Sequence, residues 1–176
     1  MSILIGVNHI ATVSRDLDNL IGFYDRIFDA KVLVDIEIPD MVLKSDPAPG
    51  RHVFISIGGP SILHAWQIDG VDPARFDGEI FDRGRVDHFS LQAGSYTDFE
   101  KLRQRLMKEG ATTGEVTDFG VMLSFSFKDP DGLWTEVSWW KDGPDLTALD
   151  ASLVKDPIAD ANPRSNAAEP LTSSAV

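Results

Sequence analysis

The chain has 176 residues, a formal net charge of −12 at pH 7 and no cysteine. The acidic balance argues against nucleic acids and anionic membrane surfaces as partners, because both would repel the protein. Without cysteine, the chain has no disulfide, no thiolate metal site and no cysteine nucleophile. Any metal must therefore be held by histidine and carboxylate side chains. No signal peptide or membrane-spanning run is apparent, so we expect a cytoplasmic protein.

In the first half of the chain, hydrophobic periodicity predicts a strand, a helix and then three strands. These elements cover residues 3–14, 16–28, 31–38, 52–57 and 61–68. The strand at 31–38 alternates, which places Val32, Val34, Ile36 and Ile38 on one face. The last two strands flank Gly58-Gly59-Pro60, a sequence typical of a turn.

The second half repeats this order of elements. They cover residues 85–93, 97–109, 111–117, 121–128 and 133–140. We expect Thr97 and Glu100 to form a capping box at the start of the helix, and Gly110 to end it. The sequence Asp129-Pro130-Asp131-Gly132 predicts a turn between the last two strands.

The two halves align as an internal duplication. The offset 88 − 9 = 79 places the apolar residues of the first helix on those of the second without a gap. The last strands align at 136 − 64 = 72, and the longer loop of the first half accounts for the difference. We therefore predict one domain over residues 1–140, with repeats at about 3–68 and 85–140 and a linker at 69–84. Residues 141–176 lack aromatics and are rich in Ala, Asp, Ser and Pro, which predicts a flexible tail.

Ligand-type side chains fall at matching places in the two repeats. His9 and His88 lie on the first strands, and His64 and Glu136 lie on the last strands. A single histidine on a strand is more often a hydrogen-bonded core residue than a ligand. Three imidazoles and a carboxylate at equivalent positions of a duplication instead indicate a first-row transition-metal site.

Side-chain alternation predicts which residues share a face with these candidates. His64 shares a face with Trp66, and Glu136 shares a face with Trp134 and Trp140. The helices must cover one face of each sheet, so the other face is free to line a cavity where the repeats meet. The tryptophans are interpreted either as an apolar substrate pocket or as ordinary core. His52 falls outside the repeat pattern, and we expect it at the edge of a loop.

Several short stretches resemble the vicinal oxygen chelate superfamily, which includes glyoxalase I, methylmalonyl-CoA epimerase, extradiol dioxygenases and the fosfomycin and bleomycin resistance proteins. The stretches are Asn8-His9-Ile10, Phe23-Tyr24, Asp87-His88-Phe89, and Asp129-Pro130-Asp131-Gly132 followed by Glu136. The resemblance covers about residues 3–140. It implies an α+β fold in which two βαβββ modules form an open, partly closed barrel around a divalent metal, and many members of the superfamily are homodimers.

The resemblance most specifically implies an Fe(II) extradiol-type ring-cleavage dioxygenase that acts on a small aromatic substrate with vicinal oxygens. His9, His88 and Glu136 would then be the iron ligands, and His64 a catalytic acid–base. Metals in such enzymes bind the two substrate oxygens and stabilise the charge that develops on them. One departure is that residues 118–127 contain neither the His nor the Tyr of the extradiol signature.

Two other functions fit the same residues. A glyoxalase- or epimerase-like lyase or isomerase would bind Ni, Co, Zn or Mn through all four candidates, with Glu136 also moving protons. A metal-free, bleomycin-resistance-like binding protein would use Trp66, Trp134 and Trp140 to line an apolar cleft, although such a cleft does not need four ligand-type residues.

Overall fold

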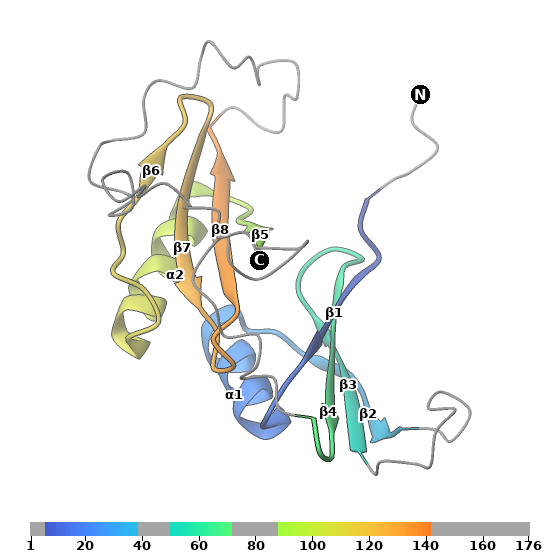
Figure 1. Ribbon diagram of the computed structural model, residues 1–176. Helices are drawn as coiled ribbons and strands as arrows, with labels where there is room; N and C mark the ends of the chain where they lie inside the picture. The colour runs from blue at the N-terminus through green and yellow to red at the C-terminus, as the bar shows by residue number, and fades with distance from the viewer. Residues whose placement is uncertain (1–5, 39–49, 72–87, 142–176) are drawn as a thin grey trace, which may run out of the picture.

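Each half of the chain folds as a βαβββ unit with its own four-stranded sheet (Figure 1). The computed structural model describes residues 6–38, 50–71 and 88–141. The first half comprises β1 (His9–Val13), α1 (Leu17–Phe28), β2 (Val32–Glu37), β3 (Gly50–Ser56) and β4 (Ile62–Ile68), and the second comprises β5 (Phe89–Gln92), α2 (Tyr96–Glu109), β6 (Thr117–Asp118), β7 (Met122–Lys128) and β8 (Trp134–Trp140). The predicted α+β fold of two such units in an open arrangement is confirmed. Most of the predicted linker and tail lies outside the described residues.

The two sheets have the same topology and the same register. Their strand orders are β1-β4-β3-β2 and β5-β8-β7-β6, with the first strand of each half parallel to the last. Ala11 pairs with His64 in the first sheet, and Ser90 pairs with Glu136 in the second. Residues 11 and 90 differ by 79, and residues 64 and 136 differ by 72. The duplication read from the sequence is therefore preserved at the level of individual residue pairs.

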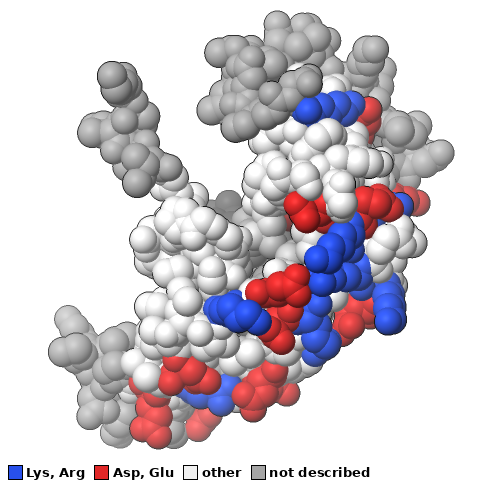
Figure 2. Space-filling model, turned by 180° about the vertical axis from the view of Figure 1, so that it is seen from behind, with Lys and Arg blue, Asp and Glu red and all other residues white. Residues whose placement is uncertain are grey.

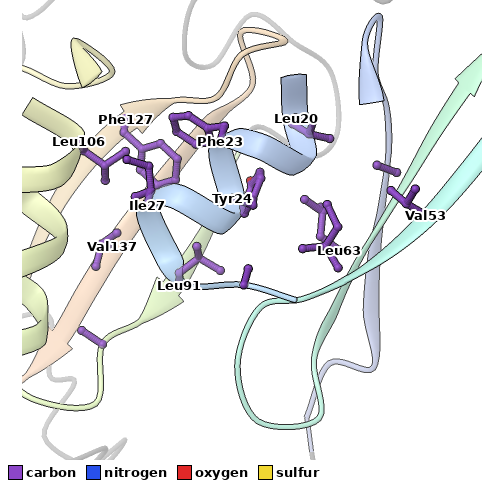
Figure 3. Packing of buried hydrophobic residues seen from close by; sticks show 14 of the residues in the cluster. Leu20, Phe23, Tyr24, Ile27, Val53, Leu63, Leu91, Leu106, Phe127 and Val137 are labelled. Carbon is purple, nitrogen blue, oxygen red and sulfur yellow. The ribbon is translucent and has the colours of Figure 1, made fainter. Parts of the chain in front are cut away.

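Helix α1 forms the centre of the molecule and lies between the two sheets (Figure 3). Toward the second sheet, the Phe23 ring stacks on Phe127 of β7 with 6.2 Å between ring centroids. The buried Leu63 and Val53 belong to the first sheet on the other side of the helix. Helix α1 buries five side chains, whereas α2 buries only Phe99 and Leu106. The hydrophobic periodicity that predicted this helix is confirmed, because its apolar side chains are buried against the sheets on both sides.

The helix ends follow from side-chain capping. The Asp16 carboxylate accepts from the Asn19 amide at 3.0 Å and begins α1. In α2 the cap is Ser95, whose hydroxyl accepts from the Asp98 amide at 3.1 Å. The predicted capping box at Thr97 was wrong by two residues, because Ser95 also has an acidic residue three positions later and its backbone is extended. The predicted end at Gly110 is confirmed by its φ of 75°.

The predicted strand at 111–117 shrinks to the two residues of β6. Gly114 has a φ of 79°, and its amide donates to the Thr112 hydroxyl at 3.1 Å. This local turn prevents an extended backbone from starting before Thr117.

Strand β2 is an edge strand whose apolar residues stay partly exposed. Its register against β3 shifts between Val32 and Val34, which breaks the single apolar face expected from the sequence. Ile36 pairs with His52 across the sheet and is 47% exposed. The open face of the first sheet therefore ends in an uncovered apolar edge.

Charged side chains of both signs are interleaved on the face shown in Figure 2. Ion pairs join the halves: Arg26 with Glu109, and Arg105 with Asp29. The backbone amide of Arg15 also donates to the Asp131 carboxylate at 2.9 Å. Within the described ranges, no helix has the length and apolarity needed to cross a membrane.

Candidate metal site

Strand alternation decides which side chains reach the open face of each sheet. In the first sheet, Val53, Leu63 and Ala65 are buried toward α1, and the residues between them point away. His64 lies between Leu63 and Ala65, and His52 directly precedes Val53, so both are on the face that points away from α1. In the second sheet Thr135 and Val137 are fully buried, and Glu136 lies between them. The candidate ligands thus lie on the faces that the helices leave open.

The first candidate, His9, is held by its neighbour. Its Nδ1 lies 2.8 Å from Oδ1 of Asn8. A carbonyl oxygen only accepts, so Nδ1 carries the proton and Nε2 of the neutral ring carries the lone pair. Nε2 is therefore the nitrogen that suits metal binding. The His9 and His64 rings are neighbours, with 5.8 Å between their centroids.

His64 lies in an aromatic environment on the same face. Its ring centroid is 4.3 Å from that of Phe54 and 4.3 Å from that of Trp66. Burial, together with charge repulsion from the neighbouring imidazoles of His52 and His9, lowers the pKa of His64 to about 4. The ring is neutral at pH 7, and its pKa is lower than an acid–base group working at that pH needs.

His52 is the site residue that sequence reasoning missed. The expectation of a loop edge was wrong: His52 is the third residue of β3 and only 7% exposed. Its Nδ1 lies 2.9 Å from Nε2 of His64, and its ring stacks on Trp66 at 4.5 Å with 13° between planes. The turn predicted around Gly59 could have revealed the position of His52. A hairpin centred at residue 59 pairs residues whose numbers sum to 118, which places His52 opposite Trp66 in the sheet.

The second pair of candidates lies at the second sheet, with Glu136 in β8 and His88 directly before β5 rather than on the strand, where the sequence had predicted it. Nε2 of His88 lies 3.8 Å from Oε1 of Glu136, and both side chains are about one quarter exposed, at 30% and 23%. The other carboxylate oxygen, Oε2, accepts from the Ser124 hydroxyl at 3.1 Å. The Ser138 hydroxyl donates to Ser124 at 3.1 Å, and Ser90 and Ser138 are 2.6 Å apart. A chain of hydroxyls therefore ends on one oxygen of Glu136.

The four candidates form two pairs rather than one cluster. His9 lies beside His64, and His88 lies beside Glu136. Across residues 6–38, 50–71 and 88–141, no three His, Cys, Asp or Glu side chains approach closely enough to hold one metal ion. The donor chemistry of each pair suits a divalent transition metal, but a single chain supplies only part of a coordination sphere on each sheet.

The three tryptophans lie apart from one another along the strands. Trp66 packs on the histidines of the first sheet. Trp134 and Trp140 are at opposite ends of β8, about 20 Å apart at the rise of an extended strand. The Nζ of Lys128 lies 4.9 Å from the Trp134 ring centroid, whereas Trp140 borders a shallow hollow with Tyr96. A common tryptophan-lined pocket stays a prediction.

A cavity of about 350 Å³ lies away from these residues, between the end of α1 and the start of α2. Its cations are Lys31, Lys101 and Arg105. Each of the three pairs with a carboxylate, namely Asp25 for Lys31 and Asp29 for the other two. The cavity is therefore lined by satisfied ion pairs and offers no unpaired cation to an anionic ligand.

Comparison with known proteins identifies the relatives of this arrangement. A family model described as the Glyoxalase/Bleomycin resistance protein/Dioxygenase superfamily matches residues 6–137. A glyoxylase/bleomycin resistance protein/dioxygenase domain from Frankia sp. EAN1pec is 28% identical, with a TM-score of 0.57 over 80% of this chain and 95% of that chain. Comparison with curated protein sequences gives no significant match.

Two more distant structures share the fold. One is a mutant of the fosfomycin resistance protein FosX from Listeria monocytogenes, in complex with Mn(II) and 1S,2S-dihydroxypropylphosphonic acid; it is 16% identical, with a TM-score of 0.52 over 78% of this chain and 94% of that one. The other is a glyoxalase I mutant from Zea mays, 22% identical, with a TM-score of 0.56 over 75% of this chain and 44% of that one.

Proposed function

Because the chain belongs to the Glyoxalase/Bleomycin resistance protein/Dioxygenase superfamily, we propose that it is a metal-dependent enzyme acting on a small molecule with two vicinal oxygens. One observation carries the proposal. At each open sheet face, a histidine at the start of the first strand (His9) or directly before it (His88) lies beside a ligand-type residue from the last strand. A duplicated scaffold has no structural need for polar groups at all four of these positions.

We assign the metal to His9, His88 and Glu136, a set of two imidazoles and one carboxylate. Nε2 of His64 already lies 2.9 Å from His52, which argues against His64 as a fourth ligand. A set of two histidines and one carboxylate that leaves open positions is typical of non-haem Fe(II) oxygenases, so iron is favoured over Ni, Co, Zn and Mn. When bound, the metal supplies Lewis-acid stabilisation of charge on the substrate oxygens.

The specific reaction proposed is extradiol-type ring cleavage of an aromatic substrate with vicinal hydroxyls. Glu136 provides the negative charge of the site, and His64, which is neutral at pH 7, orients a substrate oxygen through a hydrogen bond. Phe54 and Trp66 place aromatic rings against His64 and reduce its contact with water. The same rings suit a planar aromatic substrate.

We further propose that a second copy of the chain completes the site. The two ligand pairs lie on separate sheets, and the apolar edge of the first sheet stays uncovered, with Val32 40% and Ile36 47% exposed. A symmetric dimer would place the first half of one copy against the second half of the other, so that His9 of one chain meets His88 and Glu136 of the partner copy.

The first experiment is elemental analysis of protein purified without oxygen. The wild type should contain near-stoichiometric iron, and Glu136→Gln should lose it, because the substitution removes the anionic ligand and keeps the shape. Glu115→Gln is the matched control, since Glu115 is exposed and lies outside the site. Absence of metal from the wild type, even after soaking with divalent ions, would contradict the metal-dependent function and favour the metal-free binding protein.

Complementation tests the shared site. His9→Ala and Glu136→Ala chains are unfolded together, refolded together and compared with each variant alone. In a site shared between copies, a mixed dimer has one intact site and one doubly altered site, so metal content should recover to about one quarter of the wild type. No recovery, with mixed dimers present by mass spectrometry, would contradict the shared site.

A glyoxalase- or epimerase-like isomerase is the second candidate, favoured by one observation. Residues 118–127 lack the His and Tyr of the extradiol signature, and β7 presents Ser124 and Ser126 toward Glu136 instead. Two assays distinguish the two functions. Oxygen uptake with catechols indicates the dioxygenase, and solvent-deuterium exchange into a hydroxyketone indicates the isomerase. Bound Ni, Co, Zn or Mn together with deuterium exchange would establish the isomerase.

A further inference from the structure

In both sheets, the strand before the last carries a side chain that hydrogen-bonds the candidate on the last strand. In the first sheet this residue is His52, which contacts His64. In the second it is Ser124, which contacts Glu136. The offset of 72 that relates His64 to Glu136 also relates 52 to 124. The two contacts are therefore the same contact of the duplicated fold, made with different chemistry.

We propose that His52 and Ser124 are a repeat-related pair of positioning residues, each of which decides which atom of its partner is available to the metal. The proposal rests on the metal-dependent function proposed above and assigns roles to two residues outside the ligand set. The hydrogen bond from His52 makes Nε2 of His64 unavailable to the metal. The hydrogen bond from Ser124 holds Oε2 of Glu136 and leaves Oε1 available.

The environment of His52 indicates the direction of its hydrogen bond. Its Nε2 is buried and has no hydrogen-bond partner among the residues that the structure describes. A buried N–H without a partner is rarer in proteins than a buried acceptor without one. The proton of His52 therefore belongs on Nδ1, which donates to Nε2 of His64. The neutral His64 ring must then carry its own proton on Nδ1, and its Nε2 lone pair is occupied.

The serine contact works in the opposite sense. A carboxylate only accepts, so the Ser124 hydroxyl donates to Oε2 of Glu136. Ser138 donates to Ser124, and Ser90 lies 2.6 Å from Ser138, which fixes the direction of the chain. Ser124 is 2% exposed, so water does not compete for this bond. With Oε2 held, Oε1 is the oxygen on the side of His88.

The repeat thus explains how four equivalent positions yield three ligands. Hydrogen-bonding partners of ligands commonly fix ring tautomers and carboxylate orientation at metal sites. In the first half, the hydrogen bond from His52 prevents the His64 imidazole from binding the metal. In the second half, the hydrogen bond from Ser124 orients the Glu136 carboxylate so that it can bind the metal. His64 is left with an Nδ1–H group, which suits donation of a hydrogen bond to a substrate oxygen.

The direct test is the tautomer of His64 in the metal-free wild type, read from long-range ¹H–¹⁵N correlations of its imidazole ring. The chain has four histidines, so four single substitutions assign every ring. We expect His64 as the Nδ1–H form and His52 as the Nδ1–H form. A His64 ring protonated on Nε2 would overturn the proposal, and the tautomer itself is read in the unaltered wild type.

A matched pair of variants tests the role of His52. In His52→Asn the amide nitrogen takes the place of Nδ1 and still donates, whereas His52→Leu has nearly the same shape and no donor. Both variants lose the stacking on Trp66, so a difference between them reports the hydrogen bond alone. We expect His64 to keep its tautomer in the Asn variant and to become a mixture in the Leu variant.

Metal titration gives a second readout. In His52→Leu the freed Nε2 of His64 joins the coordination sphere, so Co(II) should bind roughly tenfold more tightly with an altered ligand-field spectrum, whereas His52→Asn should match the wild type. Equal tautomers and equal spectra in the two variants would overturn the positioning role. If no chain binds Co(II), the proposed function fails, and the tautomers of the metal-free proteins still decide the role of His52.

Discussion

The two halves of the molecule share one fold but divide its tasks differently. Helix α1 lies between both sheets and buries five side chains, whereas α2 covers one sheet and buries two. The open face of the first sheet carries three histidines among aromatic rings; that of the second carries a histidine, a carboxylate and a chain of serine hydroxyls that ends on this carboxylate. Duplication preserved the backbone register and left side chains at equivalent positions to specialise for stability or for chemistry.

The largest difference between the halves should appear in stability. Leu20 of α1 is fully buried between the sheets, whereas Leu102 of α2 is only partly buried against the core. Leu20→Ala should cost about 3 to 5 kcal/mol of unfolding free energy, because it leaves a cavity that two rigid sheets surround. Leu102→Ala is the matched control and should cost about 1 to 2 kcal/mol, because solvent and neighbouring side chains fill part of the space.

Chemical denaturation of metal-free protein at one fixed concentration measures both values, so that ligand binding and dimer formation do not distort the comparison. Equal costs for the two leucines would mean that α1 has no special place in the core, which would break the comparison of the two helices.

The ligand assignment predicts a second difference, this time in metal affinity. His88→Ala removes a ligand and should weaken Fe(II) or Co(II) binding by more than about 100-fold, the upper range for loss of a partner outside the ligand set. His64→Ala should weaken it by less than about tenfold, because Nε2 of His64 is engaged by His52. Isothermal titration under anaerobic conditions measures both. Equal losses would establish a four-ligand site and favour the isomerase.

The serine chain of the second half predicts a smaller effect on the same quantity. Ser124→Ala removes the hydroxyl that holds Oε2 of Glu136, and metal affinity should fall about 10- to 100-fold. Ser126→Ala is the control, because Ser126 lies on β7 like Ser124 and pairs in register with Glu136 of β8. Loss of affinity in both variants would indicate a general weakening of β7 rather than orientation of the carboxylate.

Much of the fold was predictable because it depends on local spacing. Alternation identified most of the strands, helical periodicity identified both helices, and the offsets of 79 and 72 aligned the two halves. The structure shows the same offsets between the pair Ala11 with His64 and the pair Ser90 with Glu136. The sequence also placed His64 and Glu136 on the faces away from the helices, since alternation along a strand is strict. These features do not depend on how the two sheets are arranged in space.

The failures arose where two local signals competed or where a contact is long-range. Ser95 and Thr97 both begin a capping pattern, and only the backbone geometry selects Ser95. Gly114 and Thr112 form a turn inside a stretch that alternation predicts as a strand. His52 was missed because the duplication replaces it with Ser124. Separation of the candidate ligands into two pairs follows from their positions on two separate sheets, which periodicity does not encode.

The smallest expected effect is on the pH dependence of stability, and it depends on a residue of the first sheet alone. The pKa of His64 is about 4 in the folded chain, against 6.5 for an ordinary histidine, because burial and the imidazoles of His52 and His9 disfavour its charged form. Between these two values the unfolded chain binds more protons than the folded chain, so stability falls as the pH drops from 6.5 toward 4.

His64→Gln removes this contribution and keeps a polar side chain on the open face. Metal-free wild type should therefore lose more stability than His64→Gln between pH 6.5 and 4. The extra loss should be about 1 kcal/mol, less than the full shift implies because the ring is partly exposed. Denaturation midpoints at several pH values measure the difference. Parallel curves would mean that His64 accepts a proton in the folded chain as easily as in the unfolded chain. In that case its aromatic surroundings would not keep it neutral, and the chemical contrast between the two open faces would be weaker than their structures indicate.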